Sequence, residues 1–229
     1  MSDLDVDELA AYLHLTPEKV RKMAQRGKLP GRRRGDQWIF SEAEIHHWLE
    51  DQIGASDAEG LDKLDGVLDR RETRMDAPPP ADTDLRSLIP LDAIEIPLAA
   101  RTRGSVIRSM CDVVARTGLL WDAPAMAVSV AAREAMHPTA LECGAALLHP
   151  RRPQSSILSD SVVGVGVTSS PIPFADNGQL VDVFFLICSY DDTTHLRILA
   201  ELSRAITTTD LLSKLRSAET PADAHAAIG

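Results

Sequence analysis

The sequence has few cysteines, no long hydrophobic run and no basic N-terminus. Its three cysteines, Cys111, Cys143 and Cys188, are an odd number that offers no disulfide framework and suits a reducing compartment. No apolar run approaches the roughly 20 residues that a membrane-spanning helix needs. The acidic start MSDLDVDELA lacks the basic and apolar parts of a secretory signal. We therefore expect a cytoplasmic protein without membrane insertion.

An excess of positive charge is also missing. The 24 basic and 34 acidic side chains give a net charge of −10 over 229 residues, which argues against a protein that coats nucleic acid over its whole surface. Hydrophobic residues make up 44% and charged residues 25%, so wholesale disorder and fibrous repeats are excluded. The length suits one large or two small domains.

One short segment reverses this balance. Eight basic residues and no acidic residue lie between Lys19 and Arg34. Such clustering is typical of a nucleic-acid contact surface, with a merely solvated cationic face as the alternative.

A stretch of low hydrophobicity divides the chain. Residues 53–84 contain Gly, Ser, Asp and the run Pro78-Pro79-Pro80, which cannot build a core, so we predict an acidic linker between a domain at 1–52 and a domain at 85–229. Inside the linker, Leu61, Leu64 and Leu68 recur at the spacing of a short amphipathic helix.

The first domain is predicted to hold three short helices and a hairpin. Asp5 and Glu8 form a capping-box pattern before the first helix. Thr16 precedes a proline at the start of the second helix, which Gly27 ends. The remaining elements are a basic turn, an apolar strand and a third helix with its own capping box, at 31–36, 38–40 and Ser41 with Glu44.

This block resembles the excisionase and MerR-like winged helix-turn-helix family. The resemblance lies in the segments LDVDELAAYL (4–13), TPEKV (16–20), RGKLP (26–30) and WIF through WL (38–49). It implies that the second helix enters the major groove of DNA and that the hairpin touches the backbone or the minor groove. The side chains to which it assigns these contacts are Lys19, Arg21, Lys22, Gln25 and Arg26 on the helix, and Arg32, Arg33 and Arg34 on the hairpin.

Arginine and lysine supply both phosphate neutralisation and base-edge contacts, so the charge pattern agrees with this resemblance. A single small module buries little surface, and tight specific binding therefore calls for a homodimer. A relic of the fold that binds protein instead of DNA is the alternative.

Residues 85–229 alternate between strand and helix patterns. The alternation predicts a three-layer α/β domain with a mixed sheet, joined through the linker to the winged helix-turn-helix head. The run VDVFFLIC reads as a strand buried on both faces. The predicted strands are 93–96, 145–148, 162–167 and 181–188, and the main helices are 102–117, 123–136 and one that Asp192 caps.

Two of the seven histidines follow strand ends. His149 comes directly after the strand GAALL, at the end where open α/β sheets place their ligand crevices. His195 falls in the first turn of a helix, where backbone N–H groups and the helix dipole favour an anion. Spacing alone leaves a structural role open for both.

The second domain looks like the enzyme IIA domain of the fructose, mannitol and nitrogen-regulatory branches of the phosphoenolpyruvate-dependent phosphotransferase system. The segments that carry the resemblance are RE (133–134), HPTAL (137–141), GAALLH (144–149), IPF (172–174), VDVFFL (181–186) and DTTHL (192–196). The resemblance implies that His149 accepts a phosphoryl group from the histidine phosphocarrier protein, and that His195 and Arg133 line the same pocket.

The chemistry of these residue types fits that assignment. A neutral imidazole is a competent nucleophile near neutral pH, and phosphoryl transfer needs positioning and positive groups more than covalent help. Arg133 can donate a bidentate pair and His195 one hydrogen bond. Thr139 can donate its hydroxyl or cap its turn. Arg151 and Arg152 can meet an acidic patch on the donor, touch the phosphate or simply face solvent.

Two neighbours of His149 depart from the family pattern. Leu148 stands where proline is common, and Pro150 stands where glycine is common. Because proline has no N–H, position 150 offers no backbone donor to a phosphate. A zinc site is the rival chemistry, since Cys143 and Cys188 precede His149 and His195, but neither interval matches the usual ligand pairs. We expect no metal and no cofactor.

A DNA-binding head on a phosphorylatable domain suggests a regulator that reports the supply of phosphoenolpyruvate. A phosphoryl group adds roughly −1.5 to −2 charges, enough to remodel a local interface. Two alternatives stay open: a phosphocarrier that passes phosphate to a separate IIB partner, and an interaction module that is never phosphorylated.

Overall fold

The computed structural model describes residues 3–13, 15–41, 44–45, 48–49, 84–175 and 178–228. The chain divides into two compact units, residues 1–80 and 81–229. The predicted linker, with its amphipathic helix, lies outside the described residues except for Asp84. Within the described part of the chain, no helix has both the length and the apolar character to cross a membrane.

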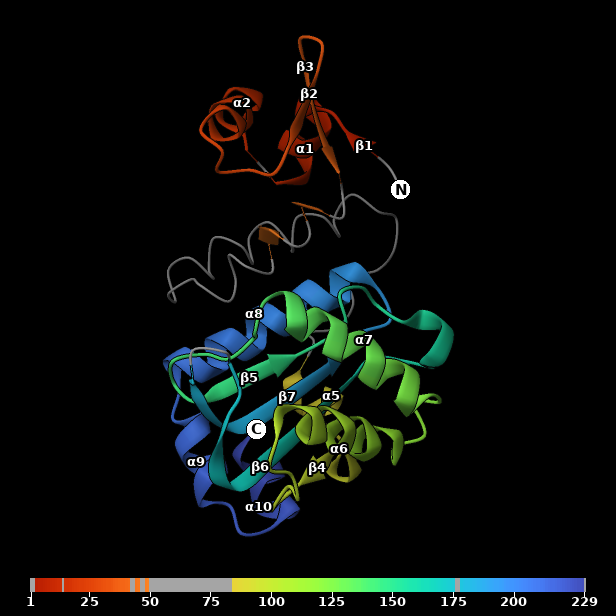
Figure 1. Ribbon diagram of the computed structural model, residues 1–229, viewed down its shortest axis with the longest axis vertical. Coiled ribbons are helices and arrows are strands. Elements are labelled where there is room, and N and C mark those ends of the chain that lie inside the picture. The colour runs from red at the N-terminus through yellow and green to blue at the C-terminus, as the bar shows by residue number, and fades with distance from the viewer. Residues whose placement is uncertain are drawn as a thin grey trace. The chain divides into compact units, whose positions relative to one another are not determined.

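The first unit contains the predicted helices and a small antiparallel sheet (Figure 1). Asp5 caps the first helix and Glu8 closes its capping box, while Thr16 accepts the N–H of Lys19 at the start of the second. Gly27 has a φ of 67°, a left-handed conformation that suits glycine at a helix end. The elements are β1 (Asp3–Leu4), α1 (Val6–Tyr12), α2 (Pro17–Gln25), β2 (Arg32–Arg34), β3 (Gln37–Ser41) and helical residues at 44–45 and 48–49.

The sheet of this unit has the order β1-β3-β2 and differs from the prediction in two ways. The three arginines 32–34 form a strand rather than a turn, and the turn itself is Gly35-Asp36. The sequence does not predict β1, because a two-residue strand carries no periodicity. A Cβ at Gly31 would lie 2.6 Å from the ring of Phe40, so glycine allows the hairpin to pass over this core residue.

The second unit is built around a four-stranded mixed sheet of order β4-β6-β7-β5. β6 runs antiparallel to β7, whereas β4 is parallel to β6 and β5 is parallel to β7. The main elements are α5 (Leu85–Leu88), β4 (Ile94–Glu95), α6 (Arg103–Ala115), α7 (Ala123–Met136), β5 (Ala145–Leu148), β6 (Val162–Pro173), β7 (Leu180–Cys188), α8 (Asp192–Thr208), α9 (Leu211–Ser217) and α10 (Pro221–Ala227), with 3₁₀ turns at 91–93 and 155–157.

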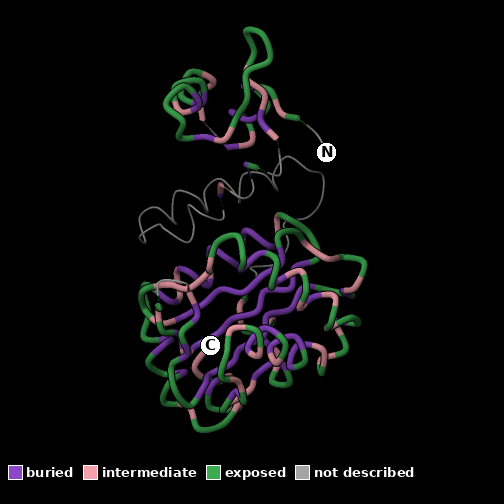
Figure 2. The backbone as a smooth tube through the Cα atoms, viewed as in Figure 1, coloured by how far each residue is buried: buried purple, intermediate pink, exposed green. Residues whose placement is uncertain are grey.

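Both faces of this sheet are covered, which confirms the three-layer fold (Figures 1 and 2). Phe184, Leu186 and Cys188 belong to one core cluster with residues of α6 and α7. The alternate residue Phe185 lies with Leu202 of α8 and Leu211 of α9 on the other face. Because successive strand residues point to opposite faces, the fully buried run of β7 requires a helical layer on each side.

The predicted boundaries hold with small corrections. α7 has the predicted range 123–136, while α8 is capped by Asp191 and not by Asp192, because the Asp191 carboxylate is the one that accepts the N–H of Thr194. β6 extends six residues past the predicted end. After a shift in register between Val167 and Ile172, it continues to pair with the first residues of β7.

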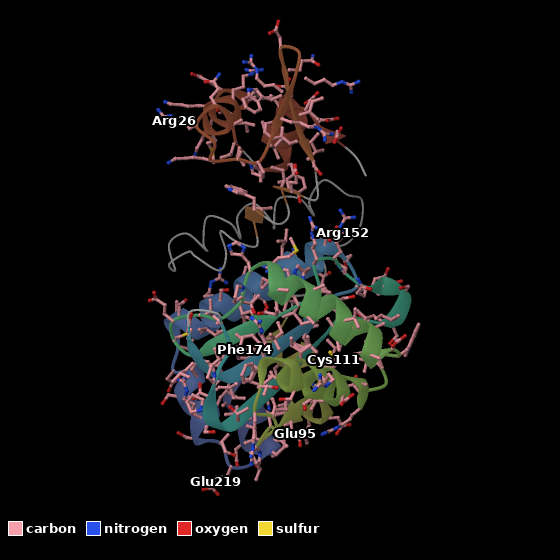
Figure 3. The ribbon with its side chains drawn as sticks, viewed as in Figure 1. Arg26, Glu95, Cys111, Arg152, Phe174 and Glu219 are labelled. Atoms are coloured by element: carbon pink, nitrogen blue, oxygen red, sulfur yellow. The ribbon has the colours of Figure 1, made fainter. Side chains whose placement is uncertain are left out.

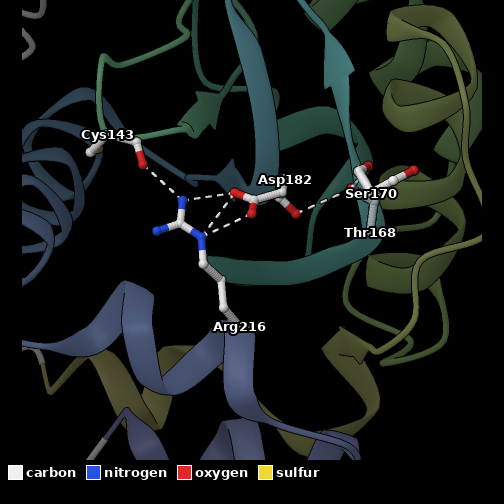
Figure 4. Close-up of polar contacts among 5 residues, drawn as sticks. All are labelled: Cys143, Thr168, Ser170, Asp182 and Arg216. Atoms are coloured by element: carbon white, nitrogen blue, oxygen red, sulfur yellow. Dashed lines mark hydrogen bonds and ion pairs between the residues drawn. The ribbon is translucent and has the colours of Figure 1, made fainter.

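One ion pair joins α9 to the amino-terminal edge of β5 and β7 (Figure 4). The Arg216 guanidinium contacts both oxygens of Asp182 at 2.8–3.1 Å and donates to the carbonyl of Cys143 at 2.8 Å. Gly144 has a φ of 84°, and a Cβ there would lie 2.8 Å from Arg216. This cluster therefore fixes the turn before β5 at the end of the strand opposite His149.

Candidate functional site

The two predicted histidines lie at the carboxyl edge of neighbouring parallel strands. Leu148, the last residue of β5, pairs in register with Leu186 of β7. His149 follows β5 directly, and the chain leaves β7 through Ser189 to enter α8, whose first turn contains His195. The topology thus brings together residues that are 46 positions apart in the sequence.

The imidazole rings of His149 and His195 form a buried pair. Their centroids lie 5.0 Å apart with an angle of 57° between the planes. The two side chains are only 3% and 4% exposed. A pair of histidines held this close at a strand edge can present two ring nitrogens to one small anion.

A backbone contact sets the tautomer of His149. Its Nδ1 lies 2.8 Å from the carbonyl oxygen of Leu147, two residues earlier in the chain. A carbonyl only accepts hydrogen bonds, so Nδ1 carries the proton. In the neutral ring the nucleophilic lone pair then lies on Nε2.

Ser189 contacts the second histidine, and the sequence does not single it out. Its hydroxyl lies 3.0 Å from Nδ1 of His195, and the serine is 1% exposed. Nothing in the spacing of a serine after an apolar strand indicates this contact, which depends on how α8 folds back over the strand end.

Arg133 lies at the end of α7 with its side chain buried. The residue is 4% exposed, and its Nη1 donates to the carbonyl of His137 at 2.7 Å. This bond fixes the guanidinium beside the turn 137–139.

The neighbouring Glu134 is 1% exposed and anchors the same turn. Its carboxylate accepts hydrogen bonds from the backbone N–H of Thr139, at 3.2 and 3.3 Å, and from the Thr139 hydroxyl. Burial raises the pKa of Glu134 above its ordinary value, although the bonds from Thr139 and the charge of Arg133 oppose that rise. The hydroxyl of Thr139 is thus directed to Glu134, which favours the turn-capping role over phosphate contact.

The anchored turn connects with the strand that carries His149. The N–H of Leu147 donates to the carbonyl of Thr139 at 3.4 Å, and Ala140 pairs with Ala146 in antiparallel register. Leu147 therefore donates a hydrogen bond from its N–H to the turn and accepts one from Nδ1 of His149 with its carbonyl oxygen.

The two departures from the family pattern sit on opposite sides of His149. Leu148 is fully buried in the core cluster that includes residues of α6 and α7. This position therefore suits an apolar side chain. Pro150 is buried, while the next two residues, Arg151 and Arg152, are exposed. The chain turns outward directly after the histidine.

The cysteines considered for a zinc site do not gather at the histidines. Cys143 lies before the amino end of β5, and His149 lies after its carboxyl end. Cys188 is completely buried, and burial raises the pKa of its thiol well above the ordinary value. Among the described residues, no three His, Cys, Asp or Glu side chains are placed to hold a metal ion.

In the first unit, the predicted cations of α2 lie on its exposed side. Val20 and Ala24 turn into the core, so the charged residues face outward, with Arg26 at the end of the helix (Figure 3). A groove of about 520 Å³ follows this face and is lined by Thr16, Glu18, Lys19, Lys22, Met23, Arg26 and Lys28. Arg21 and Gln25 are also exposed.

The three hairpin arginines have different surroundings. Arg32 forms a bidentate pair with Asp3 of β1 at 2.8 and 3.0 Å. The guanidinium carbon of Arg33 lies 6.0 Å from the ring centroid of Trp38, the residue directly across the hairpin. Arg34 is exposed at the tip. The sequence does not indicate the pair with Asp3, since it does not indicate β1 itself.

Comparisons with known proteins match both units. The family described as "Phosphoenolpyruvate-dependent sugar phosphotransferase system, EIIA 2" matches residues 87–229, and the helix-turn-helix domain family matches residues 4–53. No curated protein matches the chain in a sequence comparison.

Similar solved structures share the fold of the second unit. Nitrogen regulatory protein IIA-Ntr from Neisseria meningitidis is 18% identical with a TM-score of 0.56, over 63% of this chain and 99% of its own. IIA mannitol from Escherichia coli is 15% identical with a TM-score of 0.54, over 61% and 98%. A complex of enzyme IIA mannitol with phosphorylated enzyme IIB mannitol, also from Escherichia coli, gives 15% and 0.52, over 62% and 98%. The chain belongs to the EIIA 2 family of the phosphoenolpyruvate-dependent sugar phosphotransferase system and carries a helix-turn-helix domain ahead of its EIIA domain.

Proposed function

We propose that this chain is a regulator linked to the phosphotransferase system, in which His149 accepts a phosphoryl group and the helix-turn-helix domain binds DNA. The observation that carries the first half is the buried histidine pair, with Nδ1 of His149 held by the Leu147 carbonyl. The exposed cations of α2 support the second half.

The transfer step needs no proton movement on His149. The Nε2 lone pair attacks the phosphorus of a phosphohistidine on the histidine phosphocarrier protein, in line with the bond that breaks. The N–P bond of the donor breaks as the new N–P bond forms, and its electron pair stays on the donor imidazole. Nδ1 keeps its proton throughout, bonded to Leu147.

His195 and Arg133 would stabilise the charge on the transferred group. If the Ser189 hydroxyl donates to Nδ1 of His195, the ring presents Nε2–H toward a phosphoryl oxygen. A guanidinium has five N–H donors, so Arg133 can hold His137 and contact phosphate at once. Both groups are buried, where such contacts are stronger than in water.

DNA binding follows from the arrangement of charge on the first unit. Lys19, Lys22 and Arg26 face one groove, and Arg21 and Gln25 are exposed on the same helix. Arg33 and Arg34 of the hairpin would contact the backbone, with Arg32 oriented by Asp3. Phosphorylation of His149 would alter DNA or partner binding through the added negative charge.

A second candidate function is a phosphocarrier that passes the group to a IIB partner. A similar fold has been solved with phosphorylated enzyme IIB mannitol, which favours this candidate. A transfer assay with purified IIB proteins from the same cell distinguishes the two functions. Transfer of label from this chain to a IIB protein would establish the carrier, and a regulator would keep its label.

The test of phosphorylation uses the full chain with phosphoenolpyruvate, enzyme I and the histidine phosphocarrier protein. We expect acid-labile label on the wild type, no label on His149→Ala, and slower labelling of His195→Ala. His225→Ala, on α10, is the matched control and should label normally. An unlabelled wild type beside an active donor would contradict the proposal and leave an unphosphorylated interaction module.

The test of DNA binding selects sequences from random duplexes with the phosphorylated and unphosphorylated chain. We expect an enriched sequence whose affinity differs between the two states. Equal affinity in both states would contradict regulation by His149, and no enrichment would contradict specific DNA binding.

A further inference from the structure

The exposed residues of α7 are all apolar, with the half-buried Ser129 as the one polar side chain that is not fully buried, which is unusual for a surface helix. Its exposed residues are Pro124, Val128, Ala131, Ala132, Ala135 and Met136. Val128 is 71% exposed and Met136 is 50% exposed. The only charged residues of the helix, Arg133 and Glu134, both point inward. An isolated helix in water carries polar groups on its outer face, so this face has the composition of one that a protein covers.

The neighbouring helix α6 packs beside α7 (Figure 1). A groove lined by residues of both helices lies between them. Its volume is about 400 Å³. The α7 wall is apolar, and on the α6 wall Gly104 leaves open space because a Cβ there would meet only the end of Arg108. The residues that line the groove are Gly104, Ile107, Arg108 and Asp112 from α6, and Ala123, Pro124, Ala127, Val128 and Ala131 from α7.

The two charges of the groove have opposite sign and lie one helical turn apart. Arg108 and Asp112 are both exposed on the ridge of α6. A two-fold axis that crosses α6 near position 110 would place Arg108 of one copy opposite Asp112 of the other, twice by symmetry. On α7, Val128 lines the same groove and is 71% exposed.

We propose that the α6–α7 face binds a second copy of this chain, with α6 against α6 and α7 against α7, antiparallel. Both Arg108–Asp112 pairs would form at the contact between the two α6 helices, and the two Val128 side chains would pack at the contact between the two α7 helices. Copies with a net charge of −10 repel each other, and this face offers a contact that is neutral and self-complementary. Binding of an unrelated partner would not require the charges of this face to complement each other.

The size of the DNA-binding unit gives an independent reason for a pair. A single small helix-turn-helix module contacts one half-site, and two modules are normally joined to reach useful affinity. A dimer through the second unit would supply two heads. The proposal does not depend on phosphorylation of His149, which lies at the carboxyl edge of the sheet.

Charge-swapped variants of the full chain test this arrangement by sedimentation equilibrium and native mass spectrometry. We expect the wild type to dimerise, and Arg108→Asp or Asp112→Arg alone to weaken the dimer at least about tenfold, because each places like charges opposite each other twice. An equimolar mixture of the two variants should restore dimers, all of them mixed, since the aspartate introduced in one variant then faces the arginine introduced in the other. The double swap in one chain should also dimerise.

Val128→Glu and a control complete the test. Val128→Glu should make the chain monomeric while it still accepts label on His149, so a failure of this proposal is distinguishable from a failure of the proposed function. Arg101→Asp changes the charge equally outside the groove and should leave the dimer intact. A monomeric wild type, dimers that persist in every variant, or single variants that are not restored by mixing would each overturn the proposal.

Discussion

The two units of this chain expose their candidate functional residues in opposite ways. In the helix-turn-helix unit, the cations of α2 and the hairpin lie on the surface. In the EIIA unit, His149, His195, Arg133 and Glu134 are all less than 5% exposed. In the proposed function, the first unit depends on the number and position of exposed charges, and the second on the orientation of a few buried side chains.

This difference fits the chemistry of each proposed partner. A DNA backbone is a row of solvated charges, and flexible exposed cations bind it by releasing counterions. A phosphoryl group in transfer needs a few donors held in fixed directions, and burial supplies both the rigidity and a low dielectric. Substitutions should therefore have graded, salt-dependent effects in the first unit and large local effects in the second.

Beyond the complete loss of label expected for His149→Ala, the largest effect is expected at Arg133. Arg133→Ala should slow labelling of the chain by about 10²–10³-fold, because it removes a buried guanidinium that our proposal assigns to the charge on the transferred group. Arg133→Lys should recover only part of this rate, since an ammonium cannot replace the planar fork. Rates of phosphoryl transfer at saturating donor measure the effect, and circular dichroism confirms the fold. A rate within twofold of wild type would show that Arg133 acts through the His137 turn alone.

The exposed cations should show the graded behaviour. Lys19, Lys22 and Arg26 changed together to Ala should lower DNA affinity and reduce the slope of log affinity against log salt by about 0.9 for each phosphate that the variant no longer neutralises. Fluorescence anisotropy over a salt series measures the slope. Lys214→Ala, on α9, is the control and should change neither. An unchanged slope would contradict the α2 groove as the DNA contact surface.

Glu134 offers a pH-dependent test of burial. Its pKa is raised in the folded protein, so the native state holds the proton more tightly than the unfolded chain does. The free energy of unfolding should therefore fall as pH rises from the ordinary value of 4.5 through the raised folded pKa. Glu134→Gln cannot titrate and should lose this part of the pH dependence. Urea unfolding across that range measures it, and parallel curves for the two proteins would contradict it.

The smallest effect is expected at the Arg216–Asp182 pair, far from the histidines. The side chains are 37% and 20% exposed, so Arg216→Met should cost about 1 kcal/mol of unfolding free energy. Labelling of His149 should stay unchanged. Urea unfolding and the labelling assay together measure these effects. A loss of labelling without unfolding would show that the turn before β5 influences the histidine pair at the other end of the strand.

Much of the fold was predictable because local signals and packing agree. The capping residues Asp5 and Thr16 and the proline at the start of α2 predict helix starts that the structure confirms. The apolar run of β7 predicts a sheet covered on both faces, which the structure also confirms. The two-residue strand β1 was missed because its pairing with β3 is decided by tertiary contact and leaves no pattern in the sequence.

The candidate site was predictable only in part, for a similar reason. His149, His195 and Arg133 are singled out by motif and by their place after strands and helices. Ser189 is not, and Thr139 keeps two possible roles, because hydrogen bonds between side chains depend on how α7, β5 and α8 meet. Sequence motifs therefore identify the residues of such a site more readily than the hydrogen-bond partners of those residues.

The bond between His149 and the Leu147 carbonyl bears on how this site can change in evolution. The acceptor is a main-chain atom, which every amino acid at position 147 supplies. No single substitution there deletes it, whereas a side-chain acceptor would be lost with one codon change. Sequence drift around the histidine, including the leucine before it and the proline after it, can therefore proceed while the ring keeps its proton on the same nitrogen.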